Sequence, residues 1–332
     1  MLLHSVQKKC ALMKPDYFLG IDTSNYTTSA AIVDAEGRVV ANCKCPLPVA
    51  AGACGLRQSD AVFAHIKNMP SLMEMVRPYL EGGRLIAIGV SEAPRRAEGS
   101  YMPCFLSGVA AAEAAATAAG IPLYRFSHQC GHLAAALLSS EREDLFDTPF
   151  AAFHVSGGTT ELVCVKGFSP DGFSVELLGG TADLNAGQVI DRVGVMLGLR
   201  FPCGPLLETL AEKAECVPRP RVSVKGFRAN LSGVENQAKK MLSDGVAPAV
   251  IAAYVLDFVA ETLAALSGEL RNTHGPIPIV YAGGVMCNKR IRARLSSFRD
   301  TAFAEPAFSA DNAAGIALLC KKRHGGSYAN RI

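Results

Sequence analysis

Residues 151–167 read AAFHVSGGTTELVCVKG, and this stretch decides the fold. Two apolar runs flank a short Ser-Gly-Gly-Thr turn, which is the pattern of two antiparallel strands joined by a hairpin. Residues 17–34, YFLGIDTSNYTTSAAIVD, repeat the pattern with a turn rich in Ser, Thr and Asn. Each hairpin is followed by a further apolar strand, at 37–45 and at 173–180. The chain therefore predicts two halves built in the same way.

Helical and strand patterns alternate after each hairpin. In the first half we expect helices near 58–79 and 104–119, strands at 85–92 and 121–126, and then a helix carrying two histidines. In the second half we expect helices near 185–198, 204–215, 232–272, 287–298 and 311–322, with strands at 277–284 and 302–305. This alternation predicts an α/β fold with mixed sheets, as two like domains that face a central cleft. The polar connector at 139–149 places them at 15–147 and 148–324.

Composition excludes several classes of protein. With 332 residues, 49% of them hydrophobic and 19% charged, the chain is too apolar to be disordered and long enough for two packed domains. A formal net charge of only +3 excludes a globally cationic surface for nucleic acid. Any RNA contact must be local, and the basic clusters at 218–228 and 288–294 are the candidates. Each cluster equally fits an ordinary solvated face.

Cysteine usage and hydropathy indicate a cytoplasmic protein. The eleven cysteines are an odd number without a C-x-x-C pair, which favours reduced thiols over disulfides or a Cys-based zinc site. The N-terminus lacks the pattern of a signal peptide. The longest apolar stretch, 246–266, is interrupted by Asp257 and Glu261, so we expect a buried helix and no membrane span.

Two histidines stand at the head of an alanine-rich run, FSHQCGHLAAAL at 126–137. Positions i and i+4 share a helix face, so His128 and His132 can offer two imidazoles to one cation, or can be ordinary polar residues. Asp311 precedes another helix, where an N-cap is the simplest role. Together the three side chains would form a metal site of two imidazoles and one carboxylate.

Glycine-rich turns supply candidate sites for an anion. In SGGTTEL (156–162) and in YAGGVMCNKR (281–290), glycines at a strand end allow the main chain to approach a phosphate, although both can be plain turns or packing positions. Neither matches the G-x-G-x-x-G or P-loop pattern. Asp191, four residues after Gly187 on a predicted helix, can accept from ribose hydroxyls.

In this order the motifs resemble one family, the TsaD or O-sialoglycoprotein endopeptidase-like family, whose members are the transferase subunits of tRNA threonylcarbamoyladenosine synthesis. The resemblance spans roughly residues 17–320 and includes NLSGVEN at 230–236. It implies a metal site and an adenylate site. The implied metal ligands are His128, His132 and Asp311, and the implied adenylate contacts are His154, Val155, Ser156, Gly157, Gly158, Asp191, Gly204 and Asn288.

The family belongs to the actin/hexokinase/sugar-kinase fold superfamily. Membership implies an acyltransferase that moves a threonylcarbamoyl group from threonylcarbamoyl-adenylate to the adenosine 3′ of the tRNA anticodon. It also implies one divalent metal ion, iron or zinc, and an adenylate nucleotide, threonylcarbamoyl-AMP or ATP. The expected partners are tRNA, a smaller paralogous subunit and an ATPase subunit.

Some positions depart from the family pattern. The family stretch E-T-S-x-D-E-T is DTSNYTT here, so its Asp-Glu pair is missing and Asn25 and Tyr26 lie in that part of the hairpin. The A-G-P-G-L stretch is replaced by a longer segment with Arg95 and Arg96. Two alternatives follow: a non-catalytic nucleotide-binding partner subunit, or an ATP-dependent small-molecule kinase or carbamoyltransferase. A peptidase is not indicated, because H-E-x-x-H is absent.

Overall fold

The computed structural model describes residues 14–24, 26–48, 56–305 and 312–328. The chain forms two compact units, one of residues 1–128 with 316–332 and one of residues 129–315. This division differs from the expected one at 147/148. The final helix, α10 (Ala313–Tyr328), packs on the first unit's sheet: a Cβ added to Gly89 would lie 2.8 Å from Cβ of Cys320. Such long-range packing leaves no local signal in the sequence.

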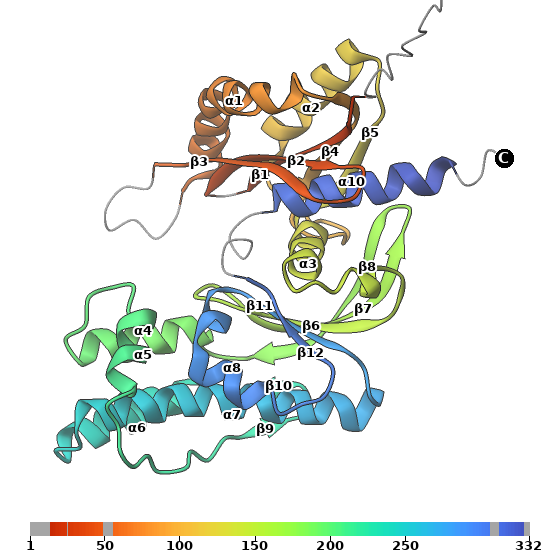
Figure 1. The fold of residues 1–332 in the computed structure, drawn as a ribbon. Helices are drawn as coiled ribbons and strands as arrows, with labels where there is room; N and C mark the ends of the chain where they lie inside the picture. The colour runs from red at the N-terminus through yellow and green to blue at the C-terminus, as the bar shows by residue number, and fades with distance from the viewer. Residues whose placement is uncertain (1–13, 25, 49–55, 306–311, 329–332) are drawn as a thin grey trace, which may run out of the picture. The chain divides into compact units, whose positions relative to one another are not determined.

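The first unit is built on a five-stranded sheet in the order β3-β2-β1-β4-β5. Its strands are β1 (Asp16–Ser24), β2 (Thr27–Asp34), β3 (Val39–Pro46), β4 (Arg84–Ala93) and β5 (Leu123–Ser127). The strands β1, β2 and β3 are antiparallel, whereas β4 runs parallel to β1, and β5 parallel to β4. Helices α1 (Gln58–Leu80) and α2 (Phe105–Ala119) cover one face and α10 lies on the other (Figure 1).

The second unit repeats that topology. Its sheet has the order β12-β11-β6-β7-β8-β10-β9, in which β8-β7-β6 is the antiparallel part and β11 and β12 extend it in parallel. The strands are β6 (Phe150–Val155), β7 (Thr160–Ser169), β8 (Gly172–Thr181), β9 (Val224–Lys225), β10 (Arg228–Ala229), β11 (Ile279–Ala282) and β12 (Thr301–Phe303). The predicted α/β fold with mixed sheets and two like halves is confirmed.

The second unit contains one long apolar helix and several shorter helices, most of which pack around it. They are α3 (His128–Ser139), whose first residue ends the first unit, α4 (Ala186–Met196), α5 (Gly204–Ala211), α6 (Ser232–Ser243), α7 (Pro248–His274) and α8 (Lys289–Leu295). Short 3-10 turns occur at η1 (Glu143–Asp147) and η2 (Gly284–Cys287). The single helix expected over 232–272 is two helices, because Pro248 lacks the N–H that a continuing helix needs and instead starts α7.

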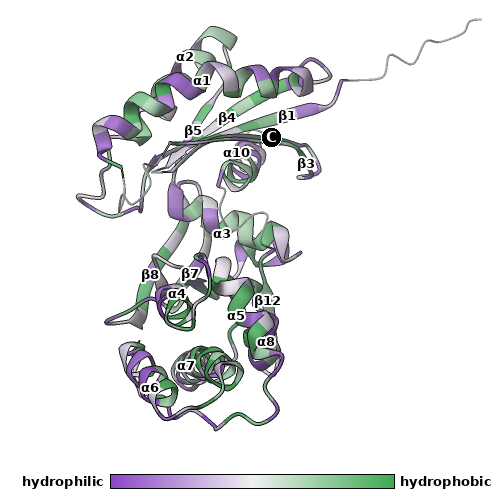
Figure 2. Cartoon of the chain, turned by 90° about the vertical axis from the view of Figure 1, so that its left-hand side faces the viewer, coloured by the Kyte–Doolittle hydropathy of each residue, from purple (hydrophilic) through white to green (hydrophobic). Residues whose placement is uncertain are grey.

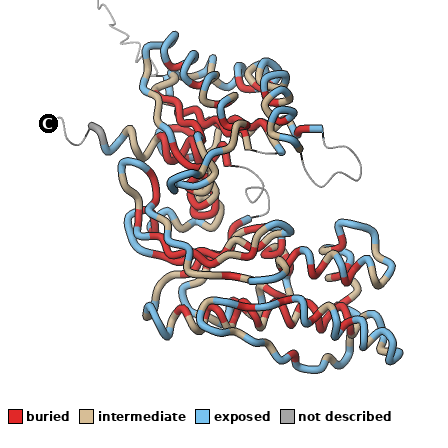
Figure 3. The backbone as a smooth tube through the Cα atoms, turned by 180° about the vertical axis from the view of Figure 1, so that it is seen from behind, coloured by how far each residue is buried: buried red, intermediate tan, exposed pale blue. Residues whose placement is uncertain are grey.

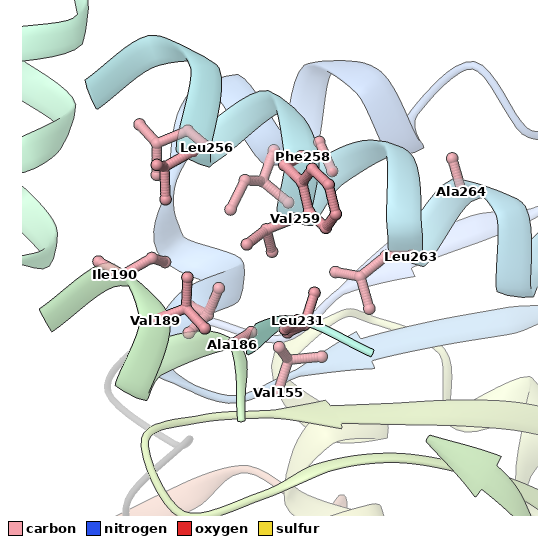
Figure 4. Close-up of a cluster of buried hydrophobic side chains, with 14 of the residues drawn as sticks. Val155, Ala186, Val189, Ile190, Leu231, Leu256, Phe258, Val259, Leu263 and Ala264 are labelled. Atoms are coloured by element: carbon pink, nitrogen blue, oxygen red, sulfur yellow. The ribbon is translucent and has the colours of Figure 1, made fainter. Parts of the chain in front are cut away.

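Helix α7 is a core element of the second unit. Among the described residues it alone is long and apolar enough to cross a membrane, yet 72% of its apolar window is buried. Its side chains, with Phe258 and Val259 among them, pack over Val189 of α4 and Val155 of β6 (Figure 4). Apolar residues concentrate in the strands and in α7 (Figure 2), and the same segments are the most buried (Figure 3). The end of β6 is thereby fixed in position.

Candidate functional site

A cavity of about 260 Å³ lies within the second unit. Four of the residues that the sequence predicts as adenylate contacts line it, namely Gly157, Asp191, Gly204 and Asn288. They come from the β6–β7 turn, from α4, from the start of α5 and from the junction of β11 with α8. Folding therefore brings together positions up to 131 residues apart in the sequence (157 to 288).

The β6–β7 turn forms one wall of the cavity. Its first residue, Ser156, donates its N–H to the carbonyl of Thr159 at 2.7 Å. The Oγ of Ser156 accepts from the N–H groups of Gly158 at 3.2 Å and Thr159 at 3.1 Å, which fixes the turn from within. No heavy atom lies within 4 Å of a Cβ placed on Gly157 or Gly158. The turn thus presents bare main chain on its open side.

The first turn of α4 packs directly against this hairpin. The N–H of Gly187 donates to the carbonyl of Ser156 at 3.1 Å, and the N–H of Ala186 donates to Oγ1 of Thr160 at 2.9 Å. A Cβ on Gly187 would lie only 2.7 Å from Cα of Gly157, so the contact requires glycine. Because the positive end of an 11-residue helix meets a bare glycine turn, an anion is favoured here.

Two carboxylates line the cavity near α5. Oδ1 of Asp191 accepts the N–H of Cys203 at 2.8 Å, which ties α4 to the turn before α5. Glu208 accepts the N–H of Lys289 at 2.6 Å through Oε1. Each carboxylate has further lone pairs besides those used in these hydrogen bonds. These lone pairs can accept hydrogen bonds from the two hydroxyls of a ribose. Glu208 was missed from the sequence; its signal is the i+4 spacing from Gly204, which places both on one face of α5.

The β11–α8 junction closes the other side. Gly283 adopts φ +102°, and a Cβ there would lie 2.3 Å from the carbonyl oxygen of Val155, so the junction and the hairpin are in main-chain contact. Asn288 is 7% exposed and caps α8 by accepting the N–H of Ile291 at 3.1 Å. The predicted glycine-rich junction thus serves packing and cavity lining together.

His128 is oriented by a buried carboxylate in the first unit. Its Nδ1 lies 2.9 Å from Oδ1 of Asp22, and its ring packs against Phe105. Asp22 is 1% exposed and also accepts a hydrogen bond from Ser91. Burial alone would raise the pKa of Asp22, but the charge and hydrogen bond of His128 and the Ser91 bond outweigh it, so the pKa is lowered.

His132 contacts another predicted site residue in the second unit. Its ring meets that of His154, on β6, edge to face at a centroid distance of 5.1 Å. His132 lies one helical turn after His128 on α3. The third predicted ligand, Asp311, is outside the described residues. Within the described ranges no group of three His, Cys, Asp or Glu side chains is arranged to hold a metal. The metal site therefore stays a prediction.

Near the turn of the first hairpin, the described residues (14–24 and 26–34) include no accessible carboxylate. Asp22 is buried and bonded, and Tyr26 is 51% exposed. Asn25 is outside the described residues. A second carboxylate that a kinase could use, Asp60, is exposed near the start of α1. A kinase base at either position stays a prediction.

In one of the two candidate RNA contacts, the cluster at 288–294, two arginines form ion pairs with α7. Arg290 binds Asp257 with both Nε and Nη2, at 2.5 and 2.7 Å, and Arg294 binds Glu261 likewise, at 2.7 and 3.1 Å. These carboxylates are the charges that interrupt the apolar run of α7. These ion pairs join α8 to α7 and offset the charge of both arginines. The contact of this cluster with RNA stays a prediction.

The chain matches the model of one protein family, TsaD: tRNA N6-adenosine threonylcarbamoyltransferase, over residues 64–318. The match covers more than half of the chain. It runs from within α1 to the first part of α10, and it includes both histidines of α3, the β6–β7 turn and the whole cavity.

Solved structures are similar in fold. The (R)-2-hydroxyglutaryl-CoA dehydratase component A of Acidaminococcus fermentans is 16% identical at a TM-score of 0.53, covering 93% of this chain and 99% of that one. A ROK family glucokinase of Streptomyces griseus in complex with glucose and AMPPNP is 13% identical, with TM-score 0.50 and coverages of 93% and 100%. HypF of T. kodakarensis is 13% identical with TM-score 0.59, and the match covers 96% of this chain and 48% of HypF. The actin/hexokinase/sugar-kinase fold is thereby confirmed.

Proposed function

The chain belongs to the TsaD family of tRNA N6-adenosine threonylcarbamoyltransferases, and we propose that it carries out the family reaction itself. In this reaction threonylcarbamoyl-adenylate is the donor and the adenosine 3′ of the tRNA anticodon is the acceptor. The single observation that carries the proposal is the cavity of the second unit, where a glycine turn, a helix N-terminus and two carboxylates converge.

The cavity has complementary groups for each polar part of an adenylate. The Gly157–Gly158 turn and the start of α4 suit the phosphate, because the open glycine main chain with the N–H of Gly157 and the helix dipole favour negative charge. Asp191 and Glu208 suit the ribose hydroxyls. The remaining wall, which includes Asn288, suits the base. The bound AMPPNP of the glucokinase, a protein of the same fold, adds support.

One divalent ion, iron or zinc, fits the donor set on α3. Asp22 engages Nδ1 of His128, which leaves Nε2 as the nitrogen that would ligate, and a buried carboxylate behind a ligating histidine is a common arrangement. His132 on the same helix face would be the second ligand and Asp311 the third. A metal held there supplies Lewis acidity toward phosphate and hydroxyl oxygens.

The chemistry needs no covalent enzyme intermediate. N6 of the adenosine attacks the carbamoyl carbon of the mixed anhydride, the bond from that carbon to the phosphate oxygen breaks, N6 loses its proton to water, and AMP leaves. The N–H of Gly157 and the dipole of α4 would stabilise the charge that develops on the departing phosphate. Because the first hairpin lacks the family's Asp-Glu pair and Asp22 is buried, we expect slow transfer.

The altered hairpin also supports an alternative, a partner subunit that binds the nucleotide without turning it over. As an enzyme, the chain would work with a smaller paralogous subunit and an ATPase subunit, in the cytoplasm. The kinase alternative is less well supported, since Asp22 is engaged by His128 and Ser91.

A transfer assay tests the proposal. The purified chain is incubated with unmodified tRNA and with threonylcarbamoyl-adenylate labelled in its threonine, in an extract that lacks TsaD-family proteins and supplies partner subunits. We expect equal amounts of labelled tRNA and AMP. Donor binding without labelled tRNA would indicate the non-catalytic subunit, and sugar-dependent release of ADP from ATP would indicate a kinase.

A further inference from the structure

The second unit carries four exposed cations on one short segment, which we call the basic edge. Its members are Arg219, Arg221, Lys225 and Arg228. The stretch from 216 to 234 contains no Asp or Glu, so no local carboxylate offsets them. None of the four forms an ion pair with another residue in the described part of the chain.

The segment is held so that its cations face outward. Pro220 is buried, and Val222 and Val224 pack on the hydrophobic core of the unit. Arg221 and Ser223, which lie between them, are exposed, as is Arg219 just before Pro220, and this alternation is typical of an extended chain. Successive outward side chains are therefore about 6.6 Å apart along the segment. Arg219, Arg221 and Lys225 lie along one segment, with Ser223 between the last two, and Arg228 follows on the next strand. Such a row of exposed cations suits a polyanion.

Two of the four cations lie opposite each other on neighbouring strands. In the β9–β10 ladder Lys225 lies directly opposite Arg228, so both side chains emerge on the same face of the hairpin. Like charges directly opposite in a sheet destabilise it. Because β9 is the edge strand of the sheet, this pair is accessible along its outer side. An anion bound between the two would offset their repulsion.

The arginines of α8, in the same unit, differ from those of the basic edge because they form ion pairs. Arg290 and Arg294 are each held by a carboxylate of α7 in a two-bond pair. Arg294 and, to a smaller extent, the charge of Arg219 lower the pKa of Glu261, and this carboxylate is already bonded to both Nε and Nη2 of Arg294. The structure thus neutralises one basic cluster and leaves the other exposed.

We propose that the basic edge binds the phosphate backbone of RNA, through charge and without reading the bases. The choice of RNA as the polyanion rests on the proposed function, in which the acceptor is a tRNA. The basic edge would add affinity to a chain whose overall charge of +3 is too small to hold RNA.

The test is the salt dependence of tRNA binding. Fluorescence anisotropy with an unmodified, dye-labelled tRNA transcript gives Kd for the wild-type chain from 50 to 300 mM KCl. Replacing all four residues by Ala should raise Kd at least tenfold at 100 mM salt and lower the slope of log Kd against log salt by about 3, since each lost phosphate contact removes roughly 0.7–0.9. AMP affinity should stay unchanged.

Two further variants serve as controls. Replacing Arg57, Lys67, Arg77 and Lys240 by Ala removes the same charge elsewhere and should leave the slope within 1 of wild type. Changing Arg219, Arg221 and Arg228 to Lys keeps the charge and should keep Kd within threefold. Binding to the phosphate backbone of RNA depends on charge and does not need the bidentate hydrogen bonds of a guanidinium group.

Each other outcome overturns the proposal in a distinguishable way. If wild type binds tRNA and the basic-edge variant binds with the same slope, the surface is misassigned while the proposed function stands. If wild type binds no tRNA, both the surface and the acceptor of the proposed function fail. If the basic-edge variant loses binding only to phosphatidylserine vesicles, the partner is a membrane and the RNA assignment is wrong.

Discussion

Gly187 of α4 stands so close to Gly157 of the β6–β7 turn that a Cβ on it would lie 2.7 Å from the Gly157 Cα. We therefore predict that Gly187→Ala displaces the turn and weakens AMP binding at least tenfold, about 1.4 kcal/mol. Isothermal titration calorimetry measures this. Gly268→Ala is the matched control: Gly268 lies inside α7 with open space around it, so Ala should leave AMP affinity unchanged and add roughly 0.5–1 kcal/mol of stability. If both variants bind AMP equally well, the β6–β7 turn is not part of the nucleotide site.

A second prediction concerns the ribose. Asp191→Asn keeps an oxygen that can accept the Cys203 N–H, but it loses the charge. Hydrogen bonds to charged groups are worth about 1.5–3 kcal/mol, so we expect roughly 10- to 100-fold weaker binding of AMP. Binding of 2′,3′-dideoxy-AMP should change little. Competition against a fluorescent AMP analogue measures both, and a uniform loss for the two ligands would contradict a ribose contact.

A third prediction concerns metal content. His132→Ala should lose the bound divalent ion, and Asp22→Asn should lower metal affinity by about 10- to 100-fold by releasing His128 from its orientation. Inductively coupled plasma mass spectrometry of the purified proteins measures the stoichiometry. His274→Ala, on an exposed histidine at the end of α7, should retain full metal. Unaltered metal in His132→Ala would refute the assignment.

A fourth prediction concerns pH. His65 is fully buried, its Nδ1 lies 2.9 Å from Oγ1 of Thr28, and burial lowers its pKa below 6.5. The unfolded chain therefore binds more protons than the folded chain as pH falls through about 6.5, and stability is lost with acidification. Thermal unfolding at pH 7.5 and 5.5 should show a smaller drop for His65→Gln than for wild type. An identical drop would assign the acid sensitivity to other groups.

Local patterns predicted most of the elements. Both hairpins, the third strands and all but one of the expected helices lie where hydrophobic periodicity and turn residues indicate, since these signals are local. The exception, 232–272, is interrupted at 244–247, and Gly245 together with the proline that starts α7 was the available clue. The return of α10 to the first unit depends on contacts more than 200 residues apart in sequence (89 to 320).

The candidate site was predicted unevenly for the same reason. Glycines and caps such as Asn288 leave a signature because few residues adopt their conformation or role. Glu208 leaves only its i+4 spacing from Gly204, because a glutamate on a helix is otherwise ordinary until the cavity beside it is known. The pairing of Arg290 with Asp257 could not be foreseen either, because it joins two helices 33 positions apart.

The most direct test of the central claim is mass spectrometry of tRNA nucleosides from cells in which this chain is the only TsaD-family transferase. The account predicts threonylcarbamoyladenosine with the wild-type chain and with Gly268→Ala, and its loss with Gly187→Ala at equal protein levels. Unmodified adenosine with a soluble wild-type chain that binds AMP would contradict the account.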